Sequence, residues 1–387
     1  MNIETRLAQA GTKQDPQTGA ISMPIYLSAT FEHPEFGQST GFDYSRTANP
    51  TRKVLEDSIA TLEEGHSGFA FSSGMAAITS VLFLFKPGDH LVISDDLYGG
   101  TYRLIEQVFK QYGITATYVD TGCLDEVTAA ITEKTAALFI ETPSNPLMKI
   151  TDLKAISELA SENDLLTIVD NTFLTPYLQK PITLGADIVI HSGTKYLGGH
   201  NDVIAGLVVT ASEELSLKIG AFQNGAGAIL SPFDSWLLLR GMKTLALRIE
   251  QQQRNAGEIA AFLVEHELVN KVYYPGLANQ EQRAIMESQS RGFGGMLSFE
   301  VKSPEIVKAV LKHVNIISFA ESLGGVETLI TYPATQTHAD IPVEIREARG
   351  VSDGLLRLSV GIESAEDLIA DLKQALHHSA SAEYVRS

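Results

Sequence analysis

The sequence has a single cysteine, Cys123, among 387 residues. One thiol cannot form an intrachain disulfide, which excludes the disulfide-rich secreted class and is typical of a reducing, cytoplasmic setting. Long hydrophobic runs are missing too. The run from Val81 to Phe85 is among the longest, and it falls far short of the ~20 apolar residues that span a bilayer. Because the first residues, MNIETRLAQAGTKQDP, contain no apolar signal segment, we expect a soluble cytoplasmic protein.

Basic residues are scarce as well. The 29 Lys and Arg residues face 47 Asp and Glu residues, which gives a net charge of −18. A nucleic-acid-binding face needs a surplus of positive charge, so this balance argues against that class of protein. The composition, 44% hydrophobic and 20% charged, is that of a globular protein, and the length favours at least two domains.

The first part of the chain differs from the rest. Residues 1–45 are polar, rich in Gly, Thr, Pro and Ser, and have no sustained hydrophobic period. They predict an extended arm that has no core of its own and docks on a neighbouring subunit. A helix that begins at Pro50 comes next. Strand-like runs then alternate with helical segments, which predicts a mostly parallel sheet with helices on both faces. The expected strands are 68–72, 90–94, 115–119, 136–141, 165–170, 186–191 and 203–210.

The pattern changes near Asp234. One long helical pattern runs from there to Ile249, and a second lies around Ile259 and Leu263. Strands at 296–301 and 355–360 alternate with further helices, which predicts a smaller α+β domain. The predicted organisation is an arm (1–45), a large α/β domain (46–240) and a C-terminal domain (241–387).

A lysine follows one of the buried strands. The apolar run 186–190 ends in His191-Ser192-Gly193-Thr194-Lys195, and open α/β sheets bind ligands at the carboxyl ends of their strands. Other strand ends carry Asp170, Tyr98 and, in a proline-bounded loop, Asn145. The Ser73-Gly74-Met75 turn precedes a helix whose first N–H groups can receive a phosphate.

Together these residues are the parts of a pyridoxal phosphate site. The lysine binds the cofactor covalently, the aspartate keeps the pyridine nitrogen protonated, and an aromatic side chain stacks on the ring. Other cofactor motifs fail: Gly193-Thr194-Lys195 is no P-loop, and the glycines at 225 and 227 lack the rest of a dinucleotide fingerprint. His191, His200 and Asp202 match no metal-ligand spacing, so we expect hydrogen-bonded histidines there.

These motifs lead to a family. The chain resembles the pyridoxal-phosphate-dependent trans-sulfuration enzymes of cysteine and methionine metabolism over nearly its whole length. The resemblance implies the aspartate-aminotransferase-like fold of these enzymes, fold type I. The matching pieces are DYSRTANPTR (43–52), SSGMAA (72–77), DLYGGTYR (96–103), ETPSNP (141–146), VDNTF (169–173), HSGTKYLGGHND (191–202), AESLGGVET (320–328) and LLRLSVGIE (355–363).

The resemblance implies roles for individual residues. Lys195 carries the cofactor and moves protons, Asp170 pairs with the pyridine nitrogen, and Tyr98 stacks on the ring and takes part in catalysis. The arm residues Tyr44 and Arg46 reach the phosphate of the adjacent subunit, in a homotetramer built from dimers that share active sites. The other implied cofactor-binding residues are Gly74, Met75, Thr172, Ser192 and Thr194.

The resemblance also implies a substrate site. Arg357 binds the substrate α-carboxylate, with help from Asn145 and Ser322. Glu321 and Asp43, at the pocket mouth, receive the distal amino group of cystathionine or the cysteine nucleophile. Thr337 and Arg103 complete the implied substrate-binding set.

The implied reaction has alternatives. The first is γ-replacement, the cystathionine γ-synthase reaction, in which cysteine (or sulfide) displaces the acyl group of an O-acylhomoserine. The second is cleavage of cystathionine at Cγ or Cβ. The third is a non-catalytic relative, which the presence of Lys195 and Arg357 disfavours.

Overall fold

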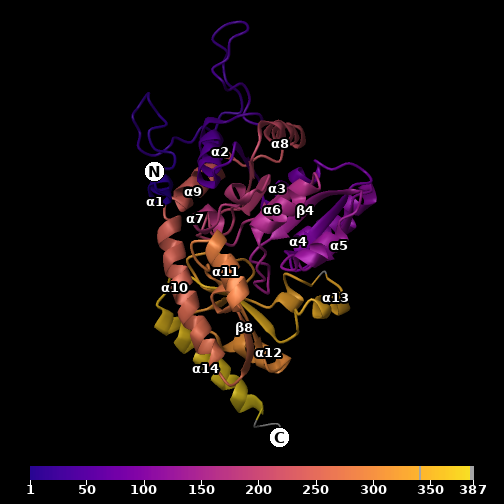
Figure 1. The fold of residues 1–387 in the computed structure, drawn as a ribbon. Helices are drawn as coiled ribbons and strands as arrows, with labels where there is room; N and C mark the ends of the chain where they lie inside the picture. The colour runs from indigo at the N-terminus through magenta and orange to yellow at the C-terminus, as the bar shows by residue number, and fades with distance from the viewer. Residues whose placement is uncertain (340, 384–387) are drawn as a thin grey trace.

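The computed structural model describes residues 1–339 and 341–383. Two sheets organise it: a seven-stranded sheet in the order β1-β7-β6-β5-β4-β2-β3 and a five-stranded sheet in the order β10-β11-β12-β9-β8. In the larger sheet only the pairings of β7 with β1 and β6 are antiparallel. The predicted α/β fold with a mostly parallel sheet is therefore confirmed (Figure 1).

The strands of the larger sheet lie where the sequence predicts them, with the largest difference, three residues, at the start of β7. They are β1 (Ser67–Phe71), β2 (His90–Ser94), β3 (Thr115–Val119), β4 (Thr135–Glu141), β5 (Leu166–Asp170), β6 (Ile188–Ser192) and β7 (Gly206–Thr210).

Helices cover both faces of this sheet because successive strand residues point to opposite sides. Leu138 and Val189 pack into one core with residues of α2 and α6, whereas Phe139 and Ile190 pack into another with residues of α3 and α8. The helices around the sheet are α2 (Pro50–Glu63), α3 (Gly74–Leu82), α4 (Gly99–Gln107), α5 (Leu124–Ala130), α6 (Leu153–Glu162), α7 (Thr175–Leu178) and α8 (Glu213–Ala226), with 3-10 turns η1 (Phe109–Tyr112) and η2 (Pro181–Leu184).

The smaller sheet has its own core. Its strands β9 (Met296–Val301) and β12 (Leu355–Ser359) were predicted. Three others were not: β8 (Val269–Tyr273) has no fully buried residue, and β10 (Ser318–Phe319) and β11 (Leu329–Thr331) are very short. The helices of this region are α9 (Pro232–Met242), α10 (Leu245–Val264), α11 (Gln280–Gln289), α12 (Pro304–His313), α13 (Val343–Ala348) and α14 (Ala365–Glu383), with 3-10 turns η3 (Pro275–Leu277) and η4 (Pro333–Thr335).

The long helix α10 runs along one side of the molecule and joins the two cores (Figure 1). Ile249 packs into the core of the larger sheet and Ile259 into that of the smaller one. The sequence pattern placed these two residues on separate helices. The helix break lies earlier, before Leu245, where Thr244 leaves the helical conformation. The domain boundary near residue 240 stays a prediction. The predicted end of the C-terminal domain, residue 387, lies outside the described residues.

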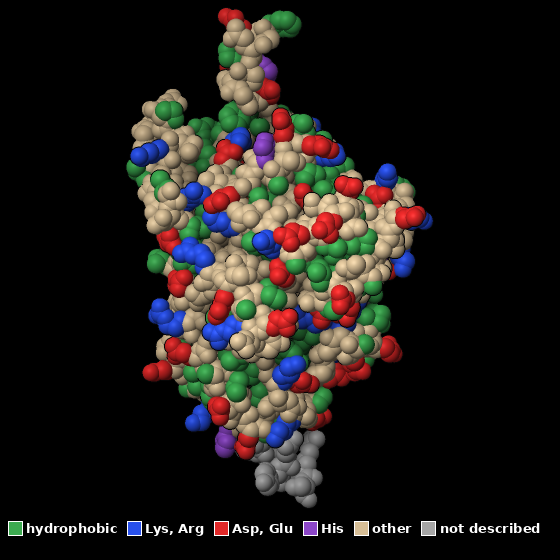
Figure 2. Space-filling view, viewed as in Figure 1, with side chains coloured by type: hydrophobic (Ala, Val, Ile, Leu, Met, Phe, Trp, Pro, Cys, Tyr) green, Lys and Arg blue, Asp and Glu red, His purple; other side chains and the backbone are tan. Residues whose placement is uncertain are grey.

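The prediction of an arm without a core is wrong for its first helix. In α1 (Ile3–Ala8), Ile3 and Leu7 are buried in the core of the larger sheet, where each contributes about 2 kcal/mol of hydrophobic stabilisation. The later part of the arm does leave the body. Leu27 is 75% exposed and Phe36 is fully exposed, and Figures 1 and 2 show the N-terminal segment projecting into solvent.

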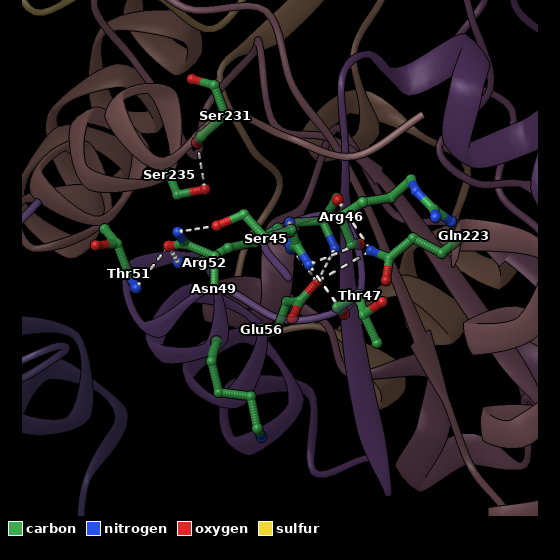
Figure 3. Close-up of polar contacts among 12 residues, drawn as sticks. Ser45, Arg46, Thr47, Asn49, Thr51, Arg52, Glu56, Gln223, Ser231 and Ser235 are labelled. Atoms are coloured by element: carbon green, nitrogen blue, oxygen red, sulfur yellow. Dashed lines mark hydrogen bonds and ion pairs between the residues drawn. The ribbon is translucent and has the colours of Figure 1, made fainter. Parts of the chain in front are cut away.

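The base of the arm is held by a buried arginine of α2. The Arg52 guanidinium donates hydrogen bonds to the carbonyls of Ser45 (2.7 Å), Arg46 (3.2 Å) and Thr47 (3.1 Å). Its Nε lies 3.3 Å from the Glu56 carboxylate. Figure 3 shows Arg52 and Glu56 among the polar contacts at the base of the arm. The projecting segment therefore rejoins the body at a fixed point just after Tyr44.

None of the helices in residues 1–339 and 341–383 has the length and apolar content needed to cross a membrane. The cytoplasmic location stays a prediction.

Candidate active site

A cavity of about 290 Å³ opens at the carboxyl ends of the central strands of the larger sheet. Its wall includes residues from the ends of β4, β5 and β6, from the start of α3, and from loops and strands of the smaller sheet. Thirteen of the predicted site residues line it, from all parts of the chain except the arm. They are Gly74, Met75, Tyr98, Asn145, Asp170, Thr172, Ser192, Thr194, Lys195, Glu321, Ser322, Thr337 and Arg357.

Lys195 projects from the loop after β6. Its Nζ donates a hydrogen bond to Ser322 Oγ at 2.8 Å. Burial lowers the pKa of Lys195 to about 8, and the nearby charge of Arg357 acts in the same direction. A lysine with this pKa is half neutral near pH 8, so its amine can act as a nucleophile or accept a proton.

Two carboxyl groups end adjacent strands. Asp170 of β5 is in register with Glu141 of β4, and Asp170 Oδ1 accepts a hydrogen bond from Thr172 N at 3.0 Å. Burial raises the pKa of both groups, and the Asp170 charge raises that of Glu141 further. A buried carboxylate needs a cationic partner to remain charged, and a protonated ring nitrogen is a suitable one.

The start of α3 is suited to bind an anion. Ser73 caps the helix by accepting a hydrogen bond from Ala76 N at 3.1 Å, and the first N–H groups of a helix attract phosphate. A Cβ on Gly74 would lie only 3.2 Å from Ser192 Oγ. The glycine therefore keeps space open between the helix start and the hydroxyls of Ser192 and Thr194.

Arg357 enters the cavity from β12 of the smaller sheet. Its Nη1 donates to Asn145 Oδ1 at 2.8 Å, and its Nη2 donates to Ser322 O at 3.2 Å and to Thr331 Oγ1 at 3.3 Å. Its buried Nε has no hydrogen-bond partner in the described part of the chain. These partners are all neutral, so the guanidinium is suited to an anionic ligand such as a carboxylate.

Four predicted residues do not line this cavity. Arg46 donates to Asn224 O at 2.6 Å and Oδ1 at 2.8 Å, and its guanidinium lies over the Tyr44 ring. Asp43 also lies in the arm, and Arg103 lies on α4. Their roles stay predictions, and those of the arm residues need the cavity of a second subunit.

Several wall residues were not in the predicted set of site residues, although the predicted phosphate-binding turn begins at Ser73. Ser73 and Glu141 add polar groups, whereas Phe173, Ile190 and Leu323 form an apolar wall. Glu141 shows the same pattern as Asp170, a carboxyl group that ends an apolar strand, but only strand register places the two side by side. The remaining wall residues are Ile78 and Ile204. Away from the wall, buried His191 lies with its Nε2 2.6 Å from Glu63 Oε1.

Pyridoxal phosphate fits this set of groups. The glycine-lined helix start and two hydroxyls match its phosphate, and the half-buried carboxyl group of Asp170 matches its ring nitrogen. A lysine amine with a lowered pKa matches its aldehyde.

Comparison with known proteins agrees with this fit. The sequence model of the Cys/Met metabolism PLP-dependent enzymes matches residues 4–377. A cystathionine gamma-synthase/O-acetylhomoserine (thiol)-lyase of Bacillus subtilis is 57% identical over 97% of this chain and 96% of its own length. A cystathionine gamma-lyase of the same organism is 53% identical over 98% and 100%. The crystal structure of a Xanthomonas oryzae cystathionine gamma synthase with aminoacrylate and cysteine superposes with a TM-score of 0.96, at 44% identity over 98% of this chain and 99% of that one. The chain belongs to the Cys/Met metabolism PLP-dependent enzyme family, and its cofactor is pyridoxal phosphate.

Proposed function

We propose that this trans-sulfuration enzyme catalyses γ-replacement, in which the thiol of cysteine displaces the acyl group of an O-acylhomoserine to give cystathionine. The observation that carries the proposal is Glu321 in the cavity wall beside Lys195 and Arg357. A carboxylate there can receive the amino group of the incoming cysteine. The 57% identical relative named for both γ-synthase and thiol-lyase activity supports the same assignment.

The side chains divide the work. Pyridoxal phosphate, when bound by these residues, would supply an electron sink that makes the α-proton of the substrate easier to remove. Arg357 holds the substrate carboxylate, and the neutral Lys195 amine takes the α-proton. Lys195 then moves protons between the α and β carbons so that the acyl group leaves Cγ. The hydrogen bond to Ser322 Oγ, 2.8 Å from Lys195 Nζ, orients the amine in the cavity. The apolar wall at Phe173 and Leu323 limits the entry of water.

A second candidate is cleavage of cystathionine. The same carboxylate anchor and the same base serve both reactions, and a 53% identical relative is named as a γ-lyase. Cleavage at Cγ differs from γ-replacement only in what happens after the γ-substituent leaves, which depends on whether a second substrate is held in the cavity. Cleavage at Cβ breaks a different carbon–sulfur bond of cystathionine.

A substrate panel tests the choice. We expect cystathionine to form from O-acetyl- or O-succinylhomoserine with cysteine, faster than ketoacid is released from cystathionine alone. Product amino acids and ketoacids are measured in parallel for each substrate, with sulfide as an alternative nucleophile. Rapid ketoacid release from cystathionine with no product from the acylhomoserines would reverse the assignment.

The arm belongs to the same proposal. We infer a homotetramer built from dimers, in which Tyr44 and Arg46 of one subunit reach the phosphate in the cavity of the next. The exposed apolar side chains of the arm, Leu27 and Phe36, support this inference because they lack a partner surface on their own subunit. The hydrogen bond from Arg52 to Ser45 O fixes the chain between Tyr44 and Arg46.

Mixing two impaired variants tests the sharing of sites. We expect Arg46→Ala to retain cofactor about tenfold less well, because one charged hydrogen bond to phosphate is lost. Mixed oligomers of Arg46→Ala and Lys195→Ala should regain turnover, since one site then combines an intact Lys195 with an intact Arg46. Asn224→Ala is the matched control, because it removes the side-chain oxygen that accepts hydrogen bonds from Arg46 and Thr47 within the same subunit and leaves Arg46 itself in place. No recovery on mixing would assign Arg46 to its own subunit.

A further inference from the structure

The loop after β4 determines where Arg357 points. Asn145 in this loop is 3% exposed, and its Oδ1 accepts the hydrogen bond from Arg357 Nη1. Its backbone carbonyl lies 3.2 Å from His338 Nε2. A shift of this loop would therefore turn the guanidinium that faces the cavity.

The loop is held by a carboxylate outside the cavity wall. Asp96, in the loop after β2, is 2% exposed. Its Oδ2 accepts hydrogen bonds from Ser144 Oγ and, at 3.0 Å, from Leu147 N. These two donors lie on either side of Asn145 in the chain. Asp96 Oδ1 is buried without a hydrogen-bond partner among the residues that the structure describes, so Asp96 holds the loop through Oδ2.

We propose that Asp96 is a positioning residue for substrate binding, whose carboxylate holds Ser144 and Leu147 and thereby sets the Asn145–Arg357 pair to receive the substrate carboxylate. The inference rests on the proposed role of Arg357. Asp96 itself does not line the cavity, so it acts through the loop. Its effect on the reaction is expected in KM and not in kcat.

The ionisation of Asp96 makes the arrangement sensitive to pH. Burial raises the pKa of Asp96 to about 6. Above that pH the carboxylate accepts both hydrogen bonds, whereas below it the protonated group loses acceptor strength. The charge of Lys149 opposes the rise and that of Asp95 adds to it, while Glu141 and Tyr273 are the other titratable groups that its charge reaches. The KM of the wild type should therefore rise as the pH falls through about 6.

Asp96→Asn in the holoenzyme tests the proposal. We expect KM for O-acetylhomoserine, with cysteine in excess, to rise about tenfold, and kcat to stay within about twofold, because a charged acceptor is lost from the substrate-anchoring side only. The rise in KM near pH 6 should vanish in this variant. Ser144→Ala should shift KM in the same direction. Asp371→Asn is the matched control, since Asp371 is another buried carboxylate that accepts backbone hydrogen bonds, from Asn315, Ile316 and Ile317, but lies away from the cavity and from the loop after β4. We expect this variant to leave KM unchanged.

The outcomes separate this inference from the proposed function. An unchanged KM in Asp96→Asn, beside a raised KM in Arg357→Lys, would overturn the role of Asp96 alone. An unchanged KM in both would overturn the role of Arg357. If Asp96→Asn fails to fold, the KM of Ser144→Ala and the pH profile of the wild type test the proposal instead. A wild-type KM that stays constant from about pH 5 to 8 would refute it.

Discussion

Lys195→Ala is expected to reduce turnover by about 10⁴-fold or more, because it removes both the covalent attachment of the cofactor and the proton-transferring base. The visible absorbance of the lysine-bound cofactor should disappear from the purified protein. Steady-state turnover and the absorbance spectrum measure the two effects separately. The expectation follows from the geometry of the amine, which is buried, hydrogen-bonded to Ser322 and shifted in pKa to about 8.

A control lysine distinguishes this effect from a general loss of charge. Lys218→Ala removes an exposed lysine of α8 that is paired with Glu214, and such surface pairs contribute about 0–1 kcal/mol. We expect wild-type turnover and spectrum from that variant. A colourless wild type that still turns over substrate, or a Lys195→Ala variant with normal turnover, would refute the assigned chemistry.

Arg357→Lys is expected to lower kcat/KM by about 100-fold, mainly through KM, because a lysine cannot reproduce the two-pronged guanidinium contact to a carboxylate. The shorter ammonium group also cannot bond Asn145, Ser322 and Thr331 together, as Arg357 does. KM and kcat are measured for the acylhomoserine substrate, and the melting temperature is measured beside them.

A second buried arginine provides the matched control. Arg346 is 5% exposed, donates to Val351 O and Asp353 Oδ1, and does not line the cavity. Arg346→Lys should lower the melting temperature without raising KM. If both variants raise KM equally, the effect of Arg357 is structural and its role as the carboxylate anchor is wrong.

The two sheets were predictable to different degrees. The strands of the larger sheet are five to seven residues long, mostly apolar or β-branched, and bounded by turn residues, and such local signals survive in the sequence. The helix start at Pro50 was equally clear, since proline and a capping asparagine mark it. In the smaller sheet, β10 and β11 have two and three residues. Strands this short are defined by their neighbours and not by their own composition.

The arm shows a different kind of failure. Its polar composition hides Ile3 and Leu7, four residues apart, which are enough to bury one short helix against the core. An isolated helix of six residues is not stable in water. Only the packing surface offered by the rest of the chain makes α1 form.

Local patterns were enough to predict the cofactor site, because Lys195, Asp170 and the Ser73-Gly74-Met75 turn each lie at or just after the end of a strand. Tertiary structure alone decided which groups meet. Register placed Glu141 beside Asp170, and packing of the smaller sheet brought Arg357 to Asn145, more than 200 residues away. The physical reason is that strand and turn preferences act over a few residues, whereas contacts between distant segments are chosen by the burial of whole faces. The pairing of β2 with β4 in the larger sheet places Asp96 against the loop that carries Asn145, a position that no local pattern indicates.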